Sequence, residues 1–194
     1  MHATKIICLS TALLLCACTT VWKAPDNVKI RGNKDTAYLD VADFSYKPAQ
    51  PVDFSKLKTC IAESVTNRAV TLTDSANSFS RPLMGVHYSG SNSHTIPGGD
   101  IFKMLDEPRR TLFASGNTSS HIDSSNDVAQ FDLHASLSDD GVTLKFINIT
   151  SAQRFSGMIR NEGFAPVELS TGARTQVVYD ALQDVANRIK TCLQ

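Results

Sequence analysis

The sequence lacks an excess of charge of either sign, and it contains no block of basic residues. Its 19 Lys and Arg residues balance 19 Asp and Glu residues over 194 positions, so the formal net charge is zero. Proteins that bind nucleic acid, or that dock on a membrane by electrostatic attraction, need a basic surface. The balance therefore argues against nucleic acid as a partner and against membrane docking by charge alone.

Motifs for catalysis are also missing. No G-x-S-x-G elbow occurs to present a nucleophilic serine, and Pro97-Gly98-Gly99 has too few glycines to cradle a phosphate. The serines between 89 and 93 stand beside His94 and near Asp100, but catalytic triads are assembled in space and not by local adjacency. We therefore assign no catalytic residue and no cofactor, and we expect a protein that is not an enzyme.

Histidine is scarce, and four histidines lie beyond the N-terminal segment: His87, His94, His121 and His134. A zinc site needs three or four ligands that converge. The best local pairs are His121 with Asp123 and Asp132 with His134, and neither has the spacing of a known metal motif. We expect polar residues on an exposed sheet face and assign no metal ligand. A metal-binding or hydrolytic site built from these histidines is the alternative.

Long apolar runs are absent except at the N-terminus. Lys5 precedes a stretch over 6–15 that is almost wholly apolar, and small residues follow it. This is the three-part layout of a secretory signal peptide. The uncharged run over 6–22 is also at the short limit for a membrane-spanning helix. An ordinary cleaved signal and an uncleaved membrane anchor are both alternatives that this run allows.

The end of the run, Leu15-Cys16-Ala17-Cys18, resembles the lipobox of bacterial lipoproteins, in which an aliphatic residue and two small positions precede an obligatory cysteine. The resemblance implies a signal peptide over 1–17, a diacylglycerol on the thiol of Cys18 and a fatty acid such as palmitate on the new N-terminus. Thr19, where some lipoproteins have Asp, implies sorting to the outer membrane, facing the periplasm. We expect a lipidated tether over 18–34 that holds the protein to the membrane.

The cysteine count leads to a disulfide. Of the five cysteines, Cys8 and Cys16 leave with the signal and Cys18 carries the lipid. Cys60 and Cys192 remain, an even pair in a compartment that oxidises thiols. Each also lies on the apolar stripe of an expected helix. We therefore predict a Cys60–Cys192 disulfide that joins two helices far apart in the sequence.

Two segments have the apolar spacing of amphipathic helices. The first covers 53–68, where Asp53 is placed to cap the N-terminus. The second covers 171–193, with Ser170 or Thr171 in capping position. Both stripes are continuous enough to face one hydrophobic core.

Strand patterns occupy most of the remaining chain. Alternation of apolar and polar residues predicts strands near 36–44, 69–73 and 110–115 and a hairpin of 129–137 with 142–150. The segment 74–107 is rich in Ser, Asn, Gly and Pro and has no sustained period, so we expect a long surface excursion there. Within it, a short strand near 83–88 and a helical turn near 101–105 are expected.

These elements predict a single α+β domain over 35–194. It consists of an antiparallel sheet of four to five strands with two helices on one face, in the order β-α-β-(long loop)-β-β-β-α. With the lipobox, this domain predicts a lipid-anchored envelope protein with a non-catalytic binding or assembly role and an envelope protein as partner. The apolar residues of the excursion are typical of an interaction surface, although they would equally cover an open sheet edge.

Overall fold

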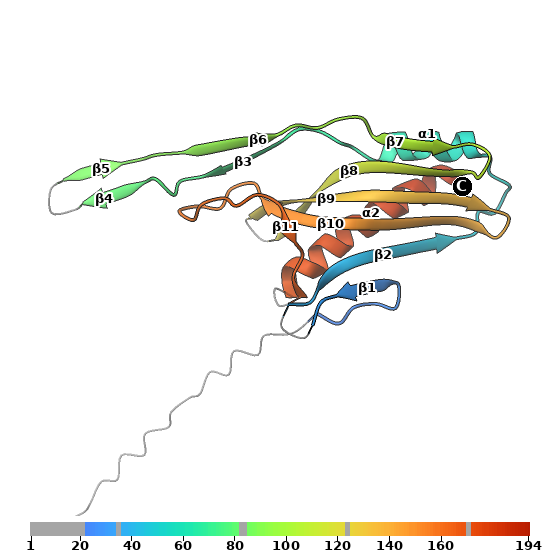
Figure 1. Ribbon diagram of the computed structural model, residues 1–194, viewed down its shortest axis with the longest axis horizontal. Coiled ribbons are helices and arrows are strands. Elements are labelled where there is room, and N and C mark those ends of the chain that lie inside the picture. Colours follow the sequence, from blue (N-terminus) through green and yellow to red (C-terminus); the bar gives the residue numbers. More distant parts are fainter. Residues whose placement is uncertain (1–21, 34–35, 82–84, 123–124, 170–171) are drawn as a thin grey trace, which may run out of the picture.

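The computed structural model describes residues 22–33, 36–81, 85–122, 125–169 and 172–194 (Figure 1). The protein has a mixed α/β fold in which two helices pack against a large antiparallel sheet, as the sequence predicts. The strand order in the sheet is β1-β2-β10-β9-β8-β7, and a short strand β11 pairs with the end of β10.

The sheet contains seven strands: β1 (Val28–Arg31), β2 (Tyr38–Tyr46), β7 (Phe102–Asp106), β8 (Thr111–Ile122), β9 (Ser125–Ser138), β10 (Gly141–Gln153) and β11 (Ala165–Pro166). Four shorter strands form two-stranded ribbons: β3 (Val70–Asp74) with β6 (Asn92–Ile96), and β4 (Phe79–Arg81) with β5 (Val86–Tyr88). The helices are α1 (Phe54–Ser64) and α2 (Gly172–Leu193).

The expectation of four to five strands is wrong, because the sheet has seven. Strand β1 lies inside the expected tether, and β7 lies where a helical turn was expected near 101–105. Both are edge strands of four or five residues. None of their side chains is buried: each is exposed or half-buried, so apolar and polar residues need not alternate. The sequence pattern that identifies central strands is therefore weak in both.

The two helices confirm the periodicity argument. Asp53 is the N-cap of α1, and its carboxylate accepts a hydrogen bond of 2.6 Å from the backbone N–H of Lys56. The helix ends at Ser64, four residues before the expected end, because the chain turns into an extended conformation at Val65. The predicted caps of the second helix, Ser170 and Thr171, lie outside the described residues.

One hydrophobic core joins the helices to the sheet. It contains inward residues of β9 and β10 such as Phe131 and Phe146, together with the apolar stripes of both helices. The predicted disulfide is confirmed: Cys60 of α1 is bonded to Cys192 of α2, with their Cα atoms 5.6 Å apart. The bond thus pins both helices to the same face of the sheet.

The folded body begins earlier than expected. Trp22 is buried against α2, where its Nε1 donates a 2.6 Å hydrogen bond to Oε1 of Gln176 and its ring lies 5.8 Å from that of Tyr179. The prediction of a tether over 18–34 is therefore wrong for residues 22–33, which pack on the domain. The signal segment, Cys18 and the remainder of the tether up to residue 21 lie outside the described residues.

The β3–β6 ribbon forms a third layer on the opposite face of the sheet. Val70 and Leu72 of β3 pack on Val128 of β9 and Ala152 of β10, which form a second, small core. The ribbon then continues as β4–β5 beyond the end of the sheet (Figure 1). The segment 74–107 is thus an ordered β arm and an edge strand in its described residues, and not an irregular excursion. Among the described residues, no helix is long and apolar enough to span a membrane.

Candidate functional site

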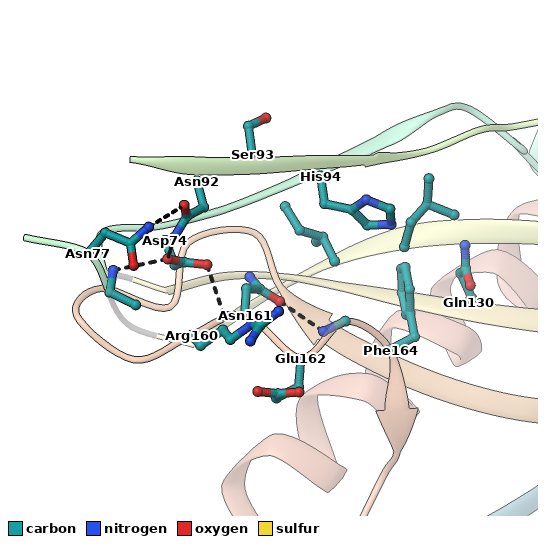
Figure 2. Close-up of a pocket in the computed structure, with 14 residues that line it drawn as sticks. Asp74, Asn77, Asn92, Ser93, His94, Gln130, Arg160, Asn161, Glu162 and Phe164 are labelled. Atoms are coloured by element: carbon teal, nitrogen blue, oxygen red, sulfur yellow. Dashed lines mark hydrogen bonds between the residues drawn. The ribbon is translucent and has the colours of Figure 1, made fainter. Parts of the chain in front are cut away.

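A pocket of about 840 Å³ opens between the β3–β6 ribbon and the loop that follows β10 (Figure 2). This volume lies in the range of small-ligand sites. Its apolar wall consists of Leu72, Ile96 and Phe164, which belong to or border the small second core. Polar side chains from β3 and the turn after it, from β6, from β9 and from the loop complete the lining: Asp74, Asn77, Asn92, Ser93, His94, Gln130, Arg160, Asn161 and Glu162.

Asp74 is the centre of the polar side of the pocket. Only 4% of this residue is exposed. Its carboxylate accepts hydrogen bonds from the backbone N–H groups of Asn161 and Ala76, both 3.0 Å, and from the side-chain amide of Asn92, 2.6 Å. A carboxylate that accepts three hydrogen bonds is stabilised in its charged form. Asp74 therefore connects the loop, the turn after β3 and strand β6.

The same hydrogen bonds lower the pKa of Asp74, with that from the Asn161 backbone contributing most and those from Ala76 and Asn92 following. Arg160 adds a smaller attraction, and burial opposes the shift. Because the pKa is lowered in the folded state, the ionised carboxylate stabilises the fold at all pH values above its unfolded pKa. This contribution is lost only as the pH falls through the lowered folded value. The connection is therefore intact at neutral pH.

Further hydrogen bonds immobilise the loop. The Nδ2 atom of Asn161 donates to the carbonyl of Gln153 at 2.8 Å, and its Oδ1 accepts from the backbone of Gly163 at 3.1 Å. On the ribbon, the Nδ2 of Asn77 donates to Oδ1 of Asn92 at 2.8 Å (Figure 2). The polar rim is thus held in place before any ligand arrives.

Besides Ser93, four polar side chains that line the pocket make no hydrogen bond to another described residue: His94, Gln130, Arg160 and Glu162. Gln130 comes from the open face of β9, His94 from β6 and the other two from the loop. Together they offer amide and guanidinium donors, amide and carboxylate acceptors, and an imidazole. These are the groups that are available to bind a ligand.

The members of the sequence pair Asp132 and His134 each contact other residues. The ring of His134 stacks on Phe113 across the strands, with centroids 4.4 Å apart and an interplanar angle of 13°. The carboxylate of Asp132 accepts hydrogen bonds from Ser115 at 2.6 Å and from Asn148 at 2.8 Å. Each member of the pair has its own partners on the open face of the sheet.

The other histidine candidates do not converge either. The His121–Asp123 pair falls outside what is described, since Asp123 and the side chain of His121 are not covered. Ser93 and His94 point to opposite sides of β6, so the local serine and histidine do not meet (Figure 2). Among the described residues, no three His, Cys, Asp or Glu side chains come together to hold a metal ion. Among the histidines whose side chains the structure describes, His94 is the one that lines the pocket.

The residues that build the pocket were not identified from the sequence. Asp74 was assigned to the start of an irregular segment, and no significance was given to Asn161 or Gln130. No sequence spacing connects positions that are 87 residues apart, as Asp74 and Asn161 are. The only local sign is Asn161-Glu162-Gly163, whose Asn and Gly are typical of a turn.

Comparison with known proteins adds little to this geometry. The sequence matches no protein family model and no curated protein. Among solved structures, a DUF4468 family protein from Bacteroides ovatus is similar over 82% of this chain and 90% of that chain. The TM-score is 0.39 and the sequence identity is 8%. A similarity at this level supports no conclusion about function.

Proposed function

We propose that this protein is a lipid-anchored protein of the cell envelope, attached to the periplasmic side of the outer membrane, that binds a neutral saccharide of the envelope or of an envelope partner without transforming it. The lipobox-like sequence supports the anchor. The observation that carries the binding role is the hydrogen-bonded polar rim around Asp74, beside four polar lining side chains that make no hydrogen bond to another described residue.

The mixture of donors and acceptors favours hydroxyl groups as ligands. A hydroxyl both donates and accepts, so it is matched by the amide of Gln130 and by the Arg160 and Glu162 side chains together. The ring of Phe164 offers an apolar surface for the C–H groups of a sugar. An anionic ligand is disfavoured because it would approach two carboxylates, those of Asp74 and Glu162, against one guanidinium.

A role in binding, and not in catalysis, is supported by the pocket's described residues, among which no nucleophile stands beside a base. The hydroxyl of Ser93 is on the far side of β6 from the ring of His94 (Figure 2). Asp74 accepts three hydrogen bonds and is held ionised, so it is a poor proton donor. These features favour recognition of an intact ligand.

The pocket is tested by titrating the isotope-labelled chain from residue 18 onward, carrying Cys18→Ser, with a disaccharide of N-acetylglucosamine. We expect NMR shift changes confined to residues that line the pocket. Gln130→Leu should weaken binding about tenfold or more, because it removes one donor and one acceptor. Gln183→Leu, on the exposed face of α2, is the matched control and should leave the affinity unchanged. Shift changes at residues outside the pocket would contradict the proposal. The absence of shift changes with a series of neutral saccharides would contradict it as well.

The anchor is tested separately in cells. Cys18→Ser should abolish incorporation of labelled fatty acid and leave the chain at its unprocessed size, because lipid attachment precedes signal cleavage in lipoproteins. Cys16→Ser should be labelled and processed like the wild type, since three leucines precede Cys16 and give the peptidase no small residue. Retained labelling of the Cys18→Ser protein would show that this cysteine is not the attachment point.

A further inference from the structure

The loop after β10 presents three apolar side chains to solvent. In the segment Arg154-Phe155-Ser156-Gly157-Met158-Ile159-Arg160, Phe155 is 59% exposed, Met158 72% and Ile159 76%. Water-exposed apolar side chains clustered on one loop are typical of an interaction site. An arginine stands on each side of the cluster, and neither forms a salt bridge with any described residue.

Backbone hydrogen bonds to β3 and the turn after it fix the loop, so that these side chains point to solvent. Thr73 of β3 donates its N–H to the carbonyl of Arg154 at 2.8 Å and accepts from Ser156 at 3.2 Å. Ser75 donates to the carbonyl of Gly157 at 2.6 Å. Gly157 has a positive φ of 67°, and apart from its two chain neighbours no residue lies within 4 Å of the position that a Cβ would take, so the turn projects from the surface. The apolar cluster is therefore a fixed, convex feature.

The loop lies at the end of the body where the chain enters. It leads into β11 and then into the start of α2, and Trp22 packs on Tyr179 in the first turns of that helix (Figure 1). Residue 18 precedes Trp22 by only four residues, which span about 14 Å at most when extended. If Cys18 carries the lipid, as the proposed function holds, this end of the body stays close to the bilayer.

We propose that the loop 154–160 is a lipid-contacting element that inserts Phe155, Met158 and Ile159 into the interface of an anionic bilayer. A convex apolar tip suits a deformable lipid surface, and apolar side chains enter the boundary between headgroups and acyl chains. The guanidinium group of Arg154 is available to bind a lipid phosphate, whereas Arg160 belongs to the pocket, where it attracts the carboxylate of Asp74. The arm beside the loop is compatible with such a surface, because the sequence from Ser75 to Gly99 contains no acidic residue.

The test uses the chain from residue 18 onward with Cys18→Ser, so that no acyl chain contributes to binding. It is sedimented with vesicles of equal parts phosphatidylglycerol and phosphatidylethanolamine. We expect binding that falls about tenfold or more in Met158→Ser/Ile159→Ser, because two apolar side chains no longer enter the lipid. Arg154→Gln should weaken binding to these vesicles and leave residual binding to phosphatidylcholine vesicles unchanged.

The matched control is Met104→Ser/Leu105→Ser, which replaces two apolar residues of edge strand β7 that are each 47% exposed. It should bind vesicles like the parent, and both double variants should unfold at the parent's temperature. Absence of vesicle binding, or an equal loss in both double variants, would overturn the inference. Saccharide binding without vesicle binding would overturn the lipid-contact inference and leave the proposed function intact. Loss of a protein cross-link in cells, without vesicle binding, would assign the loop to a protein partner instead.

Discussion

Replacing both Cys60 and Cys192 with alanine should lower the free energy of unfolding by about 4–5 kcal/mol. The two residues are separated by 132 positions, so the disulfide closes a loop that includes most of the domain. In the chain-entropy account, a longer loop gives a larger loss of freedom in the unfolded chain. Alanine is the suitable replacement because Cys60 is buried in the main core, where serine would add an unpaired hydroxyl.

Urea unfolding followed by circular dichroism measures this effect. The wild type in reductant should unfold at the same urea concentration as the double alanine variant, and reductant should not affect the variant. Leu57 and Ile61 of α1 and Ile189 of α2 stay buried in the main core in both cases, so the helical signal of the folded state should be unchanged. If the double alanine variant lost less than about 1 kcal/mol of its free energy of unfolding, core packing alone would hold the two helices together.

Arg174→Met should destabilise the protein by about 3–5 kcal/mol, because it leaves a buried carboxylate without a counter-ion. Asp127 on β9 is only 1% exposed, and its carboxylate lies 3.0 Å from Nε of Arg174 at the start of α2. Neither carboxylate oxygen has a hydrogen-bond partner among the described residues, and the buried hydroxyl of Ser120, opposite Asp127 on β8, has none either. The guanidinium is thus the main group that compensates the buried charge.

The two ends of this ion pair should respond unequally to mutation. About a third of the Arg174 side chain is exposed, so in Asp127→Asn the guanidinium gains water and the loss should be about 1 kcal/mol. The double variant Asp127→Asn/Arg174→Met should recover at least half of the loss caused by Arg174→Met, because no buried charge remains. Thermal unfolding of the wild type, the two single variants and the double variant gives the stabilities needed for a double-mutant cycle. Additive effects of the two substitutions would show that the pair does not interact.

The central elements of the fold were predictable because their patterns reflect burial within one element. The β9–β10 hairpin alternates apolar and polar residues because one face lies on the main core and the other is open. Helix α2 has a continuous apolar stripe because it lies along that same core. The disulfide followed from counting cysteines and from the place of Cys60 and Cys192 on two such stripes. Each of these inferences uses local spacing or composition alone.

Neither the edge strands of the sheet nor the pocket could be predicted from local spacing or composition. Strands β1 and β7 have few inward-facing positions, and the β3–β6 ribbon packs with only a few apolar residues on the sheet. The pocket unites Asp74, Asn161 and Gln130 from three separate parts of the chain. Their association depends on how the ribbon crosses the outer face of the sheet, which no local pattern in the sequence describes.

The order of residues along the chain was enough to predict the helices, the main hairpin, the disulfide and a lipid anchor, because each depends on residues whose relation is visible in local spacing or composition. The tertiary structure alone decided the number of strands, the early start of the body at Trp22 and the site around Asp74. A buried, hydrogen-bonded carboxylate such as that of Asp74 acquires its role from groups that reach it only after the ribbon, the loop and the sheet have packed together.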